Sequence, residues 1–392
     1  MVSTILPLLL LGVACFPFIY YILVLYSSWR FFRRTAAVSP ENSAFTPPIS
    51  NLKPVRGLDH DAYENFASFC RQDYPEYEII FCVDSNDDPV MPIIEQLQRD
   101  FPNRQIRVLF GSGRDATNDK VAKLARLAEE AQYEHLVISD SDARVKPGYL
   151  QTLISPLADS TVGAVTCFYV STGEKTFVDN LQSIGMVSDF YAGLLVAKQL
   201  DGVKFALGPT IATTRTHLAR FGGYGAIENR PADDLLVGRL IAQAGHEVRL
   251  LPYTIETVAD YQSLRELIFK RMRWLVVMRN MRPWGHLGLI FTQGLLWCLI
   301  AIAIKPTLFA GLGFLGAYLA LRMAITWTIG VWGLKRRAFL KMMPLIVIWD
   351  ALACLLWFGS FLRSTIQWRG GSYYIRNGML VPSDSIAAKN SV

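Results

Sequence analysis

Cysteine and histidine are scarce in this sequence, and neither is arranged as a set of metal ligands. The 392 residues include six cysteines and five histidines, and no two cysteines form a Cys-x-x-Cys pair. No histidine has ligand spacing to these cysteines, which argues against a zinc site. We interpret the cysteines as buried thiols in a reducing compartment. They are Cys15, Cys70, Cys82, Cys167, Cys298 and Cys354.

A strong charge bias is missing as well. The formal net charge is +6, and no Arg/Lys-rich tract with interleaved aromatic residues occurs away from the apolar segments. Nucleic acid is therefore not expected as a partner. Most basic residues lie beside apolar runs, a position that favours contact with anionic lipid headgroups.

Apolar residues, in contrast, are abundant. Hydrophobic residues make up 52% of the chain, and the mean hydropathy is +0.26. A soluble enzyme of this length would be more polar, and a single soluble domain rarely becomes so long. We therefore expect several structural units and membrane spans.

The first apolar run covers residues 4–26 and is long enough to cross a bilayer core. It lacks a preceding basic residue and a following cleavage site, so we expect an anchor, residues 1–28, rather than a removable signal peptide. Arg33 and Arg34 come shortly after it, and the positive-inside rule then places the next segment in the cytosol. Residues 29–50 are interpreted as a linker.

Residues 51–260 have the pattern of a soluble α/β domain. Apolar runs such as 79–83 and 136–138 end in acidic residues and predict buried parallel strands. Between them, residues 118–132 repeat apolar residues at helical spacing after a candidate N-cap at the first or second position. Strands that alternate with helices predict a doubly wound sheet.

The last third of the chain returns to membrane-like patterns. Residues 261–286 mix apolar and basic residues, which predicts an amphipathic segment on the membrane surface. Residues 287–365 contain three apolar runs, at 287–304, 307–332 and 344–362. The first is at the lower length limit for a span and is a candidate re-entrant segment.

The sequence leaves two or three C-terminal spans open. Three full spans would put the tail, residues 366–392, on the non-cytosolic side, whereas Arg369 and Arg376 favour the cytosol. Arg322 and Asp350 lie inside apolar runs, where isolated charges are unfavourable. We expect them to form a structural ion pair across neighbouring helices.

Three groups of acidic residues stand out. Asp84 ends one predicted strand, and Asp140 and Asp142 follow another as an Asp-Ser-Asp triplet. Ligands of open α/β sheets bind at the carboxyl ends of strands. The third group, Asp233 and Asp234, precedes a helical pattern.

These carboxylates suit a divalent cation and a proton acceptor. Mg²⁺ and Mn²⁺ take one or two protein carboxylates together with phosphate oxygens, so Asp140 and Asp142 are candidate metal ligands. Asp234 is the candidate base. Each group also has a structural interpretation, because Asp-x-Asp is common in solvated turns and Asp233 can cap the following helix.

Other polar residues have structural interpretations too. At least one of Asp87 and Asp88 is interpreted as a turn residue. In the basic segment, Lys270, Arg273 and Trp274 form a pattern that commonly anchors a helix at a membrane surface. Arg273 can also hold a diphosphate by paired hydrogen bonds.

The order of these features carries a family resemblance. Segment 53–57 (Lys-Pro-Val-Arg-Gly) is followed by Asp84, the Asp-Ser-Asp triplet, Asp234 and a basic-x-x-Arg-Trp element. Together with the Asn-Asp-Lys opening at 118–120 and the membrane layout, this resembles the ceramide glucosyltransferase family of inverting enzymes. The resemblance covers nearly the whole chain and implies a GT-A catalytic domain joined to transmembrane α-helices.

The resemblance implies a role for each position. Asp234 would be the general base, and Asp140 and Asp142 would hold Mg²⁺ or Mn²⁺. The remaining positions would bind the donor and acceptor: Pro54, Asp84, Lys120 and Asp140 on the nucleotide side, and Lys270, Arg273 and Trp274 on the diphosphate and acceptor side. Lys270 stands where the family has Gln or Arg, which keeps a charge but changes the hydrogen-bond geometry.

The implied reaction moves glucose from UDP-glucose to the primary hydroxyl of ceramide and gives a β-linked glycolipid. The catalytic domain would face the cytosol in a multi-pass protein of a bacterial inner membrane or a Golgi-type membrane. Hopanoid glycosyltransferases resemble this family closely and remain an alternative. A processive polysaccharide synthase should have Gln at position 270 and more spans. A non-catalytic membrane protein that binds lipid or nucleotide would not depend on a metal.

Overall fold

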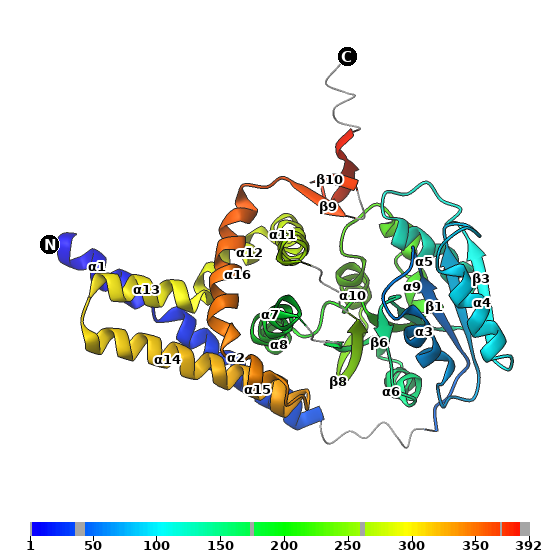
Figure 1. The fold of residues 1–392 in the computed structure, drawn as a ribbon, viewed down its shortest axis with the longest axis horizontal. Coiled ribbons are helices and arrows are strands. Elements are labelled where there is room, and N and C mark those ends of the chain that lie inside the picture. The colour runs from blue at the N-terminus through cyan, green and yellow to red at the C-terminus, as the bar shows by residue number, and fades with distance from the viewer. Residues whose placement is uncertain (1, 36–43, 173–175, 259–262, 369–370, 385–392) are drawn as a thin grey trace, which may run out of the picture. The chain divides into compact units, whose positions relative to one another are not determined.

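The computed structural model describes residues 2–35, 44–172, 176–258, 263–368 and 371–384. The chain divides into two compact units (Figure 1). The sheet unit comprises Thr35–Gly173 and Asp201–Asp260, and the helical unit comprises Met1–Arg34, Glu174–Leu200 and Tyr261–Val392.

This division differs from the predicted ranges at residues 174–200, which the sequence assigned to the domain 51–260. Their helices α7 (Phe177–Gly185) and α8 (Tyr191–Asp201) follow a strand of the sheet. However, α7 packs against α11 (Leu264–Met281) and α16 (Leu345–Phe361) of the helical unit. The predicted linker 29–50 also differs, because a helix continues to Thr35 and the first strand begins at Ile49. Residues 36–43 of that linker lie outside the described residues.

The sheet unit is built on four parallel strands, of which β1, β2 and β4 are almost wholly buried and β3 is half-buried. The strand order is β3-β2-β1-β4, and β1 pairs in parallel with both β2 and β4. The predicted strands 79–83 and 136–138 are confirmed within β2 and β4. The bounds are Ile49–Pro54 for β1, Tyr77–Val83 for β2, Gln105–Phe110 for β3 and His135–Ser139 for β4.

Four further strands extend the sheet from β4 in the order β7-β6-β8-β5. Strand β7 is antiparallel to both β4 and β6, whereas β6 and β8 are parallel. The result is a mixed, mostly parallel α/β sheet, in which the parallel strands are predicted by the sequence and the antiparallel pairs are not. The bounds are Ala143–Arg144 for β5, Val162–Thr172 for β6, Thr210–Thr214 for β7 and Glu247–Val258 for β8.

The helices of the sheet unit pack against these strands. Helix α5 (Asp119–Glu130) contacts β1 and β2, and its N-cap is Asn118, whose side chain accepts a hydrogen bond from the Val121 N–H at 3.4 Å. This confirms the predicted cap. The other helices are α3 (Ala62–Cys70), α4 (Met91–Asp100), α6 (Tyr149–Ile154), α9 (Arg215–Ala219) and α10 (Asp233–Gln243).

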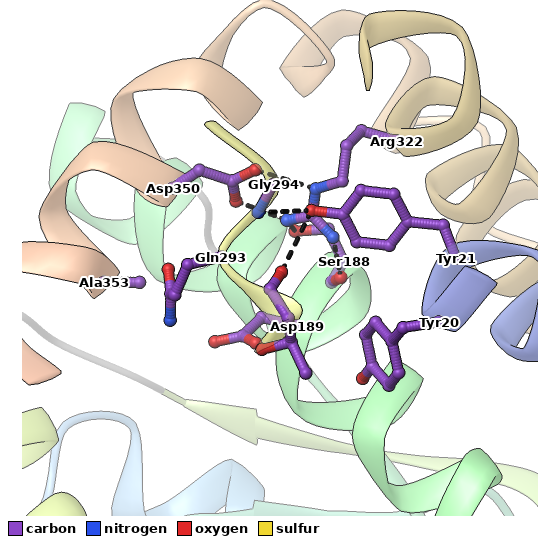
Figure 2. Close-up of a pocket in the computed structure, with 10 residues that line it drawn as sticks. Tyr20, Tyr21, Ser188, Asp189, Gln293, Gly294, Arg322, Asp350 and Ala353 are labelled. Atoms are coloured by element: carbon purple, nitrogen blue, oxygen red, sulfur yellow. Dashed lines mark hydrogen bonds and ion pairs between the residues drawn. The ribbon is translucent and has the colours of Figure 1, made fainter. Parts of the chain in front are cut away.

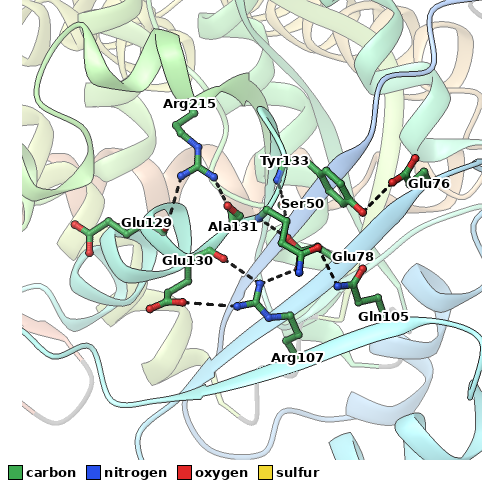
Figure 3. Close-up of polar contacts among 11 residues, drawn as sticks. Ser50, Glu76, Glu78, Gln105, Arg107, Glu129, Glu130, Ala131, Tyr133 and Arg215 are labelled. Atoms are coloured by element: carbon green, nitrogen blue, oxygen red, sulfur yellow. Dashed lines mark hydrogen bonds and ion pairs between the residues drawn. The ribbon is translucent and has the colours of Figure 1, made fainter.

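The buried carboxylate of Glu78 links β1, β2 and β3 near their amino-terminal ends (Figure 3). Glu78 on β2 is fully buried and accepts hydrogen bonds from Ser50 Oγ at 2.6 Å and from the Gln132 N–H at 2.7 Å. Arg107 on β3 pairs with the second carboxylate oxygen at 3.0 Å. Both oxygen atoms of a buried carboxylate need hydrogen-bond partners. The contacts of Glu78 therefore fix the register of β1, β2 and β3.

The helical unit contains two helices that are long and apolar enough to cross a membrane, counted within the described ranges. They cover Leu9–Arg34 and Leu308–Gly333. The first is interrupted between α1 (Val2–Val13) and α2 (Phe16–Thr35). Pro17 is the second residue of α2 and has no N–H to donate back to α1. The second consists of α14 (Leu308–Thr326) and the π-helical turn η6 (Trp327–Gly333).

The first predicted C-terminal run forms a bent pair rather than one straight helix. Residues Pro283–Thr292 and Gly294–Ile304 meet at an angle of 54°. The hydroxyl of Tyr21 donates to the Thr292 carbonyl and accepts from the Gly294 N–H, both at 3.1 Å, so the backbone groups at the break are satisfied. Helix α16, with 17 residues, is shorter than the two spans.

The predicted pairing of Arg322 with Asp350 is confirmed. Arg322 on α14 and Asp350 on α16 are both buried, and Arg322 Nε donates to Asp350 Oδ2 at 2.8 Å. The guanidinium also contacts the second oxygen of Asp350. Tyr318 donates to the same carboxylate at 2.7 Å.

The C-terminal region, for which the sequence predicted only a tail, forms an antiparallel sheet. Its strands are β9 (Thr365–Trp368), β10 (Gly371–Arg376) and β11 (Met379–Pro382). Arg279 of α11 binds the carbonyl oxygens of Ser360 and Arg363, which ties the end of α16 to α11.

Candidate functional site

Asp84 and Asp140 lie at one edge of the parallel sheet. Asp84 follows β2 and Asp140 follows β4, and both strands run parallel to β1 on its two sides. Pro54, the last residue of β1, stands opposite Cys82 of β2 at the same edge. Pro54, Asp84 and Asp140, which are predicted to bind the nucleotide, therefore lie at the carboxyl ends of neighbouring strands. This is where open α/β sheets bind their ligands.

Lys120 connects two of the acidic groups. Its ammonium lies 2.7 Å from Asp140 Oδ1 and 3.5 Å from Asp233 Oδ2. The side chains of Lys120, Asp140 and Asp233 are only 13%, 28% and 14% exposed, so these charges interact with little screening. Burial lowers the pKa of Lys120, but Asp140 and Asp233 raise it more, and the lysine stays charged.

Asp234 is held by backbone N–H groups. Its Oδ2 accepts a hydrogen bond from the Gly208 N–H at 2.9 Å, and its Oδ1 accepts one from the Leu235 N–H at 2.8 Å. Burial and the neighbouring Asp233 raise the pKa of Asp234 to about 6, while the charge of Lys120 opposes this shift. A carboxylate with that pKa is ionised at pH 7 and is a stronger base than an ordinary aspartate.

The loop 206–209 positions both Asp140 and Asp234. The Ala206 N–H donates to the Asp234 carbonyl at 3.3 Å, and the Asp140 N–H donates to the Pro209 carbonyl at 3.4 Å. Gly238 allows this packing, because a Cβ there would lie 2.2 Å from the carbonyl carbon of Phe205. Helix α10 can therefore approach the loop closely enough to place Asp234 against it.

A buried lysine lies beneath the Asp-Ser-Asp triplet. Lys53 on β1 is fully buried, and its ammonium is 3.3 Å from the Asp140 carbonyl oxygen and 3.4 Å from the centre of the Phe69 ring. Burial lowers the pKa of Lys53 to about 7, against the attraction of Asp140 and Asp142. The Asp142 carbonyl accepts from the Val258 N–H at 2.9 Å, which joins the triplet to β8.

Asp84 is paired with two basic residues. Lys123 contacts its Oδ1, and Arg56 Nε lies 3.6 Å from its Oδ2. Lys123 also reaches Asp119 at 3.2 Å and the Val55 carbonyl at 2.8 Å. The carboxylate at the end of β2 is therefore held beside the end of β1.

The turn interpretation is confirmed for Asp88. Its carboxylate accepts from the Val90 N–H at 3.0 Å, two residues on, and from the Gly57 N–H at 3.2 Å. This is the local bonding typical of an aspartate turn.

The predicted acceptor-side residues belong to α11 of the helical unit. Arg273 lies over the Trp368 ring at 5.7 Å, and Trp274 packs against Phe190 with their ring centres 5.6 Å apart. Lys270 is half-buried on the same helix. Within the helical unit, these contacts tie the basic-x-x-Arg-Trp element to β9 and to η3 (Met186–Phe190).

The predicted metal ligands have the right donor atoms. Across the ranges that the structure describes, no three or more His, Cys, Asp or Glu side chains gather as a complete metal cage. Asp140 and Asp142 are nevertheless partly exposed oxygen donors at a strand end. Mg²⁺ and Mn²⁺ are commonly held by one or two carboxylates with phosphate oxygens completing the shell, so the two residues fit such an ion.

Sequence reasoning missed the partners of these residues. The sequence pattern presents Lys53 only as the first residue of segment 53–57, and it gives no indication of Lys123 or Gly208. A lysine inside an otherwise buried strand, as at Lys53, was the available signal, because an unpaired charge there is unfavourable. No local sequence pattern indicates Gly208, because its hydrogen bond to Asp234 depends on where helix α10 packs.

The family model described as "Glycosyl transferase family 21" matches residues 9–381. The chain belongs to glycosyl transferase family 21. It is therefore a glycosyltransferase, as the acidic strand ends and the resemblance predict.

Three proteins to which the chain is similar in sequence are named ceramide glucosyltransferases. Ceramide glucosyltransferase 3 of Caenorhabditis elegans is 22% identical over 391 aligned residues, covering 94% of this chain and 81% of that protein. Ceramide glucosyltransferase 1 of the same organism is 24% identical, over 69% of this chain and 57% of that protein. The ceramide glucosyltransferase of Komagataella phaffii is 29% identical over 175 residues, or 43% of this chain and 34% of that protein.

A solved glycosyltransferase shares the fold. The mannosyltransferase PcManGT from Pyrobaculum calidifontis, solved in complex with GDP-Man and Mn²⁺, superposes with a TM-score of 0.57. The match covers 87% of this chain and 99% of that protein at 21% identity. The predicted GT-A architecture of this family member is thereby confirmed.

Proposed function

We propose that this family 21 enzyme transfers glucose from UDP-glucose to the primary hydroxyl of ceramide, with inversion at the anomeric carbon. The relatives named as ceramide glucosyltransferases support glucose as the transferred sugar and ceramide as the acceptor. The resemblance in the order of Asp84, the Asp-Ser-Asp triplet and Asp234 supports the same reaction.

The geometry of Asp234 carries this proposal. Two backbone N–H groups fix its carboxylate, and its raised pKa makes it a competent base near neutral pH. Asp234 takes the proton from the lipid hydroxyl while that oxygen bonds to the anomeric carbon. The bond from the anomeric carbon to the diphosphate oxygen breaks, and the electron pair leaves with UDP. A single displacement of this kind inverts the anomeric centre.

The leaving diphosphate requires positive charge. Asp140 and Asp142 would hold Mg²⁺ or Mn²⁺, which neutralises the diphosphate as it departs. Lys120 fixes the Asp140 carboxylate from one side, and Lys53 binds the Asp140 carbonyl from below. Arg273 suits the diphosphate because a guanidinium can donate two parallel hydrogen bonds.

The other positions follow from the family resemblance. Pro54 and Asp84, at neighbouring strand ends, would contact the nucleotide. Lys270 and Trp274 would stand on the acceptor side with Arg273. Lys120 would also face the donor.

We also propose that the protein crosses the membrane more than once, with the sheet unit in the cytosol. Two apolar helices of sufficient length support the multi-pass arrangement. Arg33 and Arg34 at the end of α2 and the basic cluster 335–337 after η6 support the orientation, because basic residues mark the cytosolic ends of spans.

A product assay on purified full-length protein in detergent tests the proposal. Ceramide or a hopanoid alcohol is offered with UDP-glucose, UDP-galactose or UDP-N-acetylglucosamine, with Mn²⁺ or with EDTA. We expect β-glucosylceramide from UDP-glucose alone and its loss in EDTA. Product formed only on a hopanoid alcohol would contradict ceramide as the acceptor. Absence of turnover with every donor would contradict the enzymatic proposal.

A further inference from the structure

Helix α16 is the last of the three apolar segments that follow α11, and its length does not match a membrane span. It has 17 residues, which is about 25 Å of α-helix, whereas the hydrocarbon core of a bilayer is about 30 Å thick. In Figure 1, α16 runs across the direction of α13 (Gly294–Ile304) and α14, which pack against each other. The helices that contact α16 indicate the depth at which it lies.

The basic helix α11 contacts α16 near its start and just past its end. Near the start, Arg271 lies over the Trp349 ring at 4.6 Å. Past the end, Arg363 lies over the Phe269 ring at 5.6 Å, and Arg279 donates to the Arg363 carbonyl at 2.6 Å. Basic residues are unfavourable in the hydrocarbon core, so α11 lies at the membrane surface. Both ends of α16 are therefore on the side of the membrane at which α11 lies.

A second polar helix, α7, packs against α16 as well. The approach is closest at Gly185, where a Cβ would lie 2.3 Å from the Trp349 ring. Helix α7 carries Asp179, Asn180 and Gln182, so it too is excluded from the hydrocarbon core. The buried face of α16 is thus covered by two helices that belong outside that core.

The ion pair in the second turn of α16 indicates the same depth (Figure 2). Arg322 binds Asp350 of α16 and also the carbonyl of Ser188 in η3, the turn that continues α7. Arg322 lies in the half of its span that leads to the basic cluster 335–337. The start of α16 is therefore near the end of the span that this cluster marks as cytosolic.

The bent pair, residues 283–304, completes the crossing instead of α16. The basic cluster 335–337 places the end of the span formed by α14 and η6 on the cytosolic side, so α14 begins on the opposite side. Only residues 305–307 separate α13 from α14, and α13 therefore ends on that opposite side too. Since α11 precedes the bent pair on the cytosolic side, the pair must cross the bilayer. Its two helices supply about 30 Å of length.

The outer face of α16 carries an apolar stripe. Ile348, Leu355 and Leu362 follow one another at intervals of seven residues and are 47%, 69% and 89% exposed. This spacing puts them on one face of the helix. Exposed Lys341 and Arg363 stand before and after the helix, where they suit anionic lipid headgroups. Because α16 also packs against α13, its stripe continues the apolar surface of a membrane span.

We propose that α16 lies in the cytosolic interface of the bilayer, with the stripe of Ile348, Leu355 and Leu362 in lipid, and that it does not cross the membrane. Two C-terminal spans remain, the bent pair and the span of α14 with η6. The sheet β9-β10-β11 stays on the cytosolic side, which is the side that the positive-inside rule favours for Arg376. The cytosolic assignment rests on the orientation in the proposed function, whereas the shared side of the two ends of α16 does not.

Cysteine labelling in sealed vesicles tests this topology. Cys15 and Cys354, the native thiols that are not buried, are first replaced by alanine. Single cysteines are then placed at exposed positions before α16 (Ala338→Cys), after α16 (Ser364→Cys) and between α13 and α14 (Lys305→Cys). We expect a membrane-impermeant maleimide to label the first two from the cytosolic side and the third from the opposite side.

Spin labels test the depth of the stripe in the same background. Labels are attached at Ile348→Cys, Leu355→Cys and Leu362→Cys, and their collisions with oxygen and with a water-soluble nickel chelate report the depth. We expect similar, shallow depths at the three positions and a greater depth at Leu315→Cys, an exposed position of α14. A spanning helix would place Leu355 deepest and the other two near opposite surfaces. Equal thermal midpoints show that the variants are folded.

Three results would overturn the inference: labelling of Ser364→Cys from the same side as Lys305→Cys, the greatest depth at Leu355, or stripe labels shielded from both collision reagents. The last result would mean that protein rather than lipid covers the stripe. An error in the proposed orientation looks different, because all three cysteines would exchange sides while Ala338→Cys and Ser364→Cys still label from one side. A failure to form glucosylceramide would change none of these measurements.

Discussion

The ammonium of Lys120 lies 2.7 Å from Asp140 Oδ1 and also reaches Asp233. Asp234 belongs to the same electrostatic group, because Asp233 raises its pKa and Lys120 lowers it. A single lysine thus balances the charges of a predicted metal ligand and of the predicted base. The pH dependence of turnover should report this balance.

The wild-type enzyme should lose activity below about pH 6. Burial and Asp233 raise the pKa of Asp234 to about 6, and the base works only when ionised. A plot of log kcat/KM against pH should therefore fall with a slope of one below that value. An acidic limb near pH 4, the ordinary range of an aspartate, would contradict the assignment of Asp234 as the titrating group.

Lys120→Met should move the acidic limb to higher pH. Without the ammonium, the ionised form of Asp234 loses a positive charge that stabilises it, so the pKa of Asp234 rises and activity at pH 7 falls. Raising the pH to 8 or 9 should restore part of kcat/KM.

Asp233→Asn should have the opposite effect on the limb, because it removes a negative charge that raises the pKa of Asp234. The matched control is Lys204→Met, which removes an exposed lysine paired with Asp201 and should shift nothing. If the acidic limbs of the pH profiles coincide in the wild type and in the Lys120, Asp233 and Lys204 variants, these charges do not act on the base.

Glu78→Gln should destabilise the sheet unit without changing kinetics. The substitution removes the charge that pairs with Arg107 and turns an amide group toward a donor in a buried site, at a cost of about 1–3 kcal/mol. Glu130→Gln is the control, since Glu130 meets the same Arg107 at the surface and should change stability by less than about 1 kcal/mol. Thermal unfolding of the purified variants measures both, and equal midpoints would contradict the account.

Arg322→Met should destabilise the helical unit strongly, by about 3–5 kcal/mol, because Asp350 is left buried and unpaired. Adding Asp350→Asn should recover much of the loss, since the amide oxygen can still accept from Tyr318. Thermal midpoints of the two single variants and the double variant test this coupling. Additive losses would show that the two residues do not act as a pair.

Local patterns predicted much of the fold. The apolar runs at 79–83 and 136–138, and the Asn118 cap before an amphipathic helix, are read from neighbouring residues, and the structure confirms them. The strand β7, antiparallel inside a parallel sheet, was not predicted, because strand direction depends on a long connection. The three strands after residue 364 were also missed, being short and without regular alternation.

The candidate site was predicted in part for the same reason. Asp84 and Asp140 could be placed together because parallel strands end at one edge. The bridging contact of Lys120 with Asp233 joins the start of α5 to the start of α10, and no local pattern indicates it. The close approach of α10 to the loop 206–209, which sets the environment of Asp234, likewise depends on tertiary packing at Gly238.

The most direct test of the central claim measures glucosylceramide formed by the wild type and by Asp234→Asn from labelled UDP-glucose, with Mn²⁺ present. The account predicts β-glucosylceramide from the wild type and a rate at least about a hundredfold lower in the variant, the usual contribution of a general base. The variant should still bind UDP-glucose and unfold at a similar temperature. Full transfer by Asp234→Asn, or no transfer to ceramide by a folded, donor-binding wild type, would contradict it.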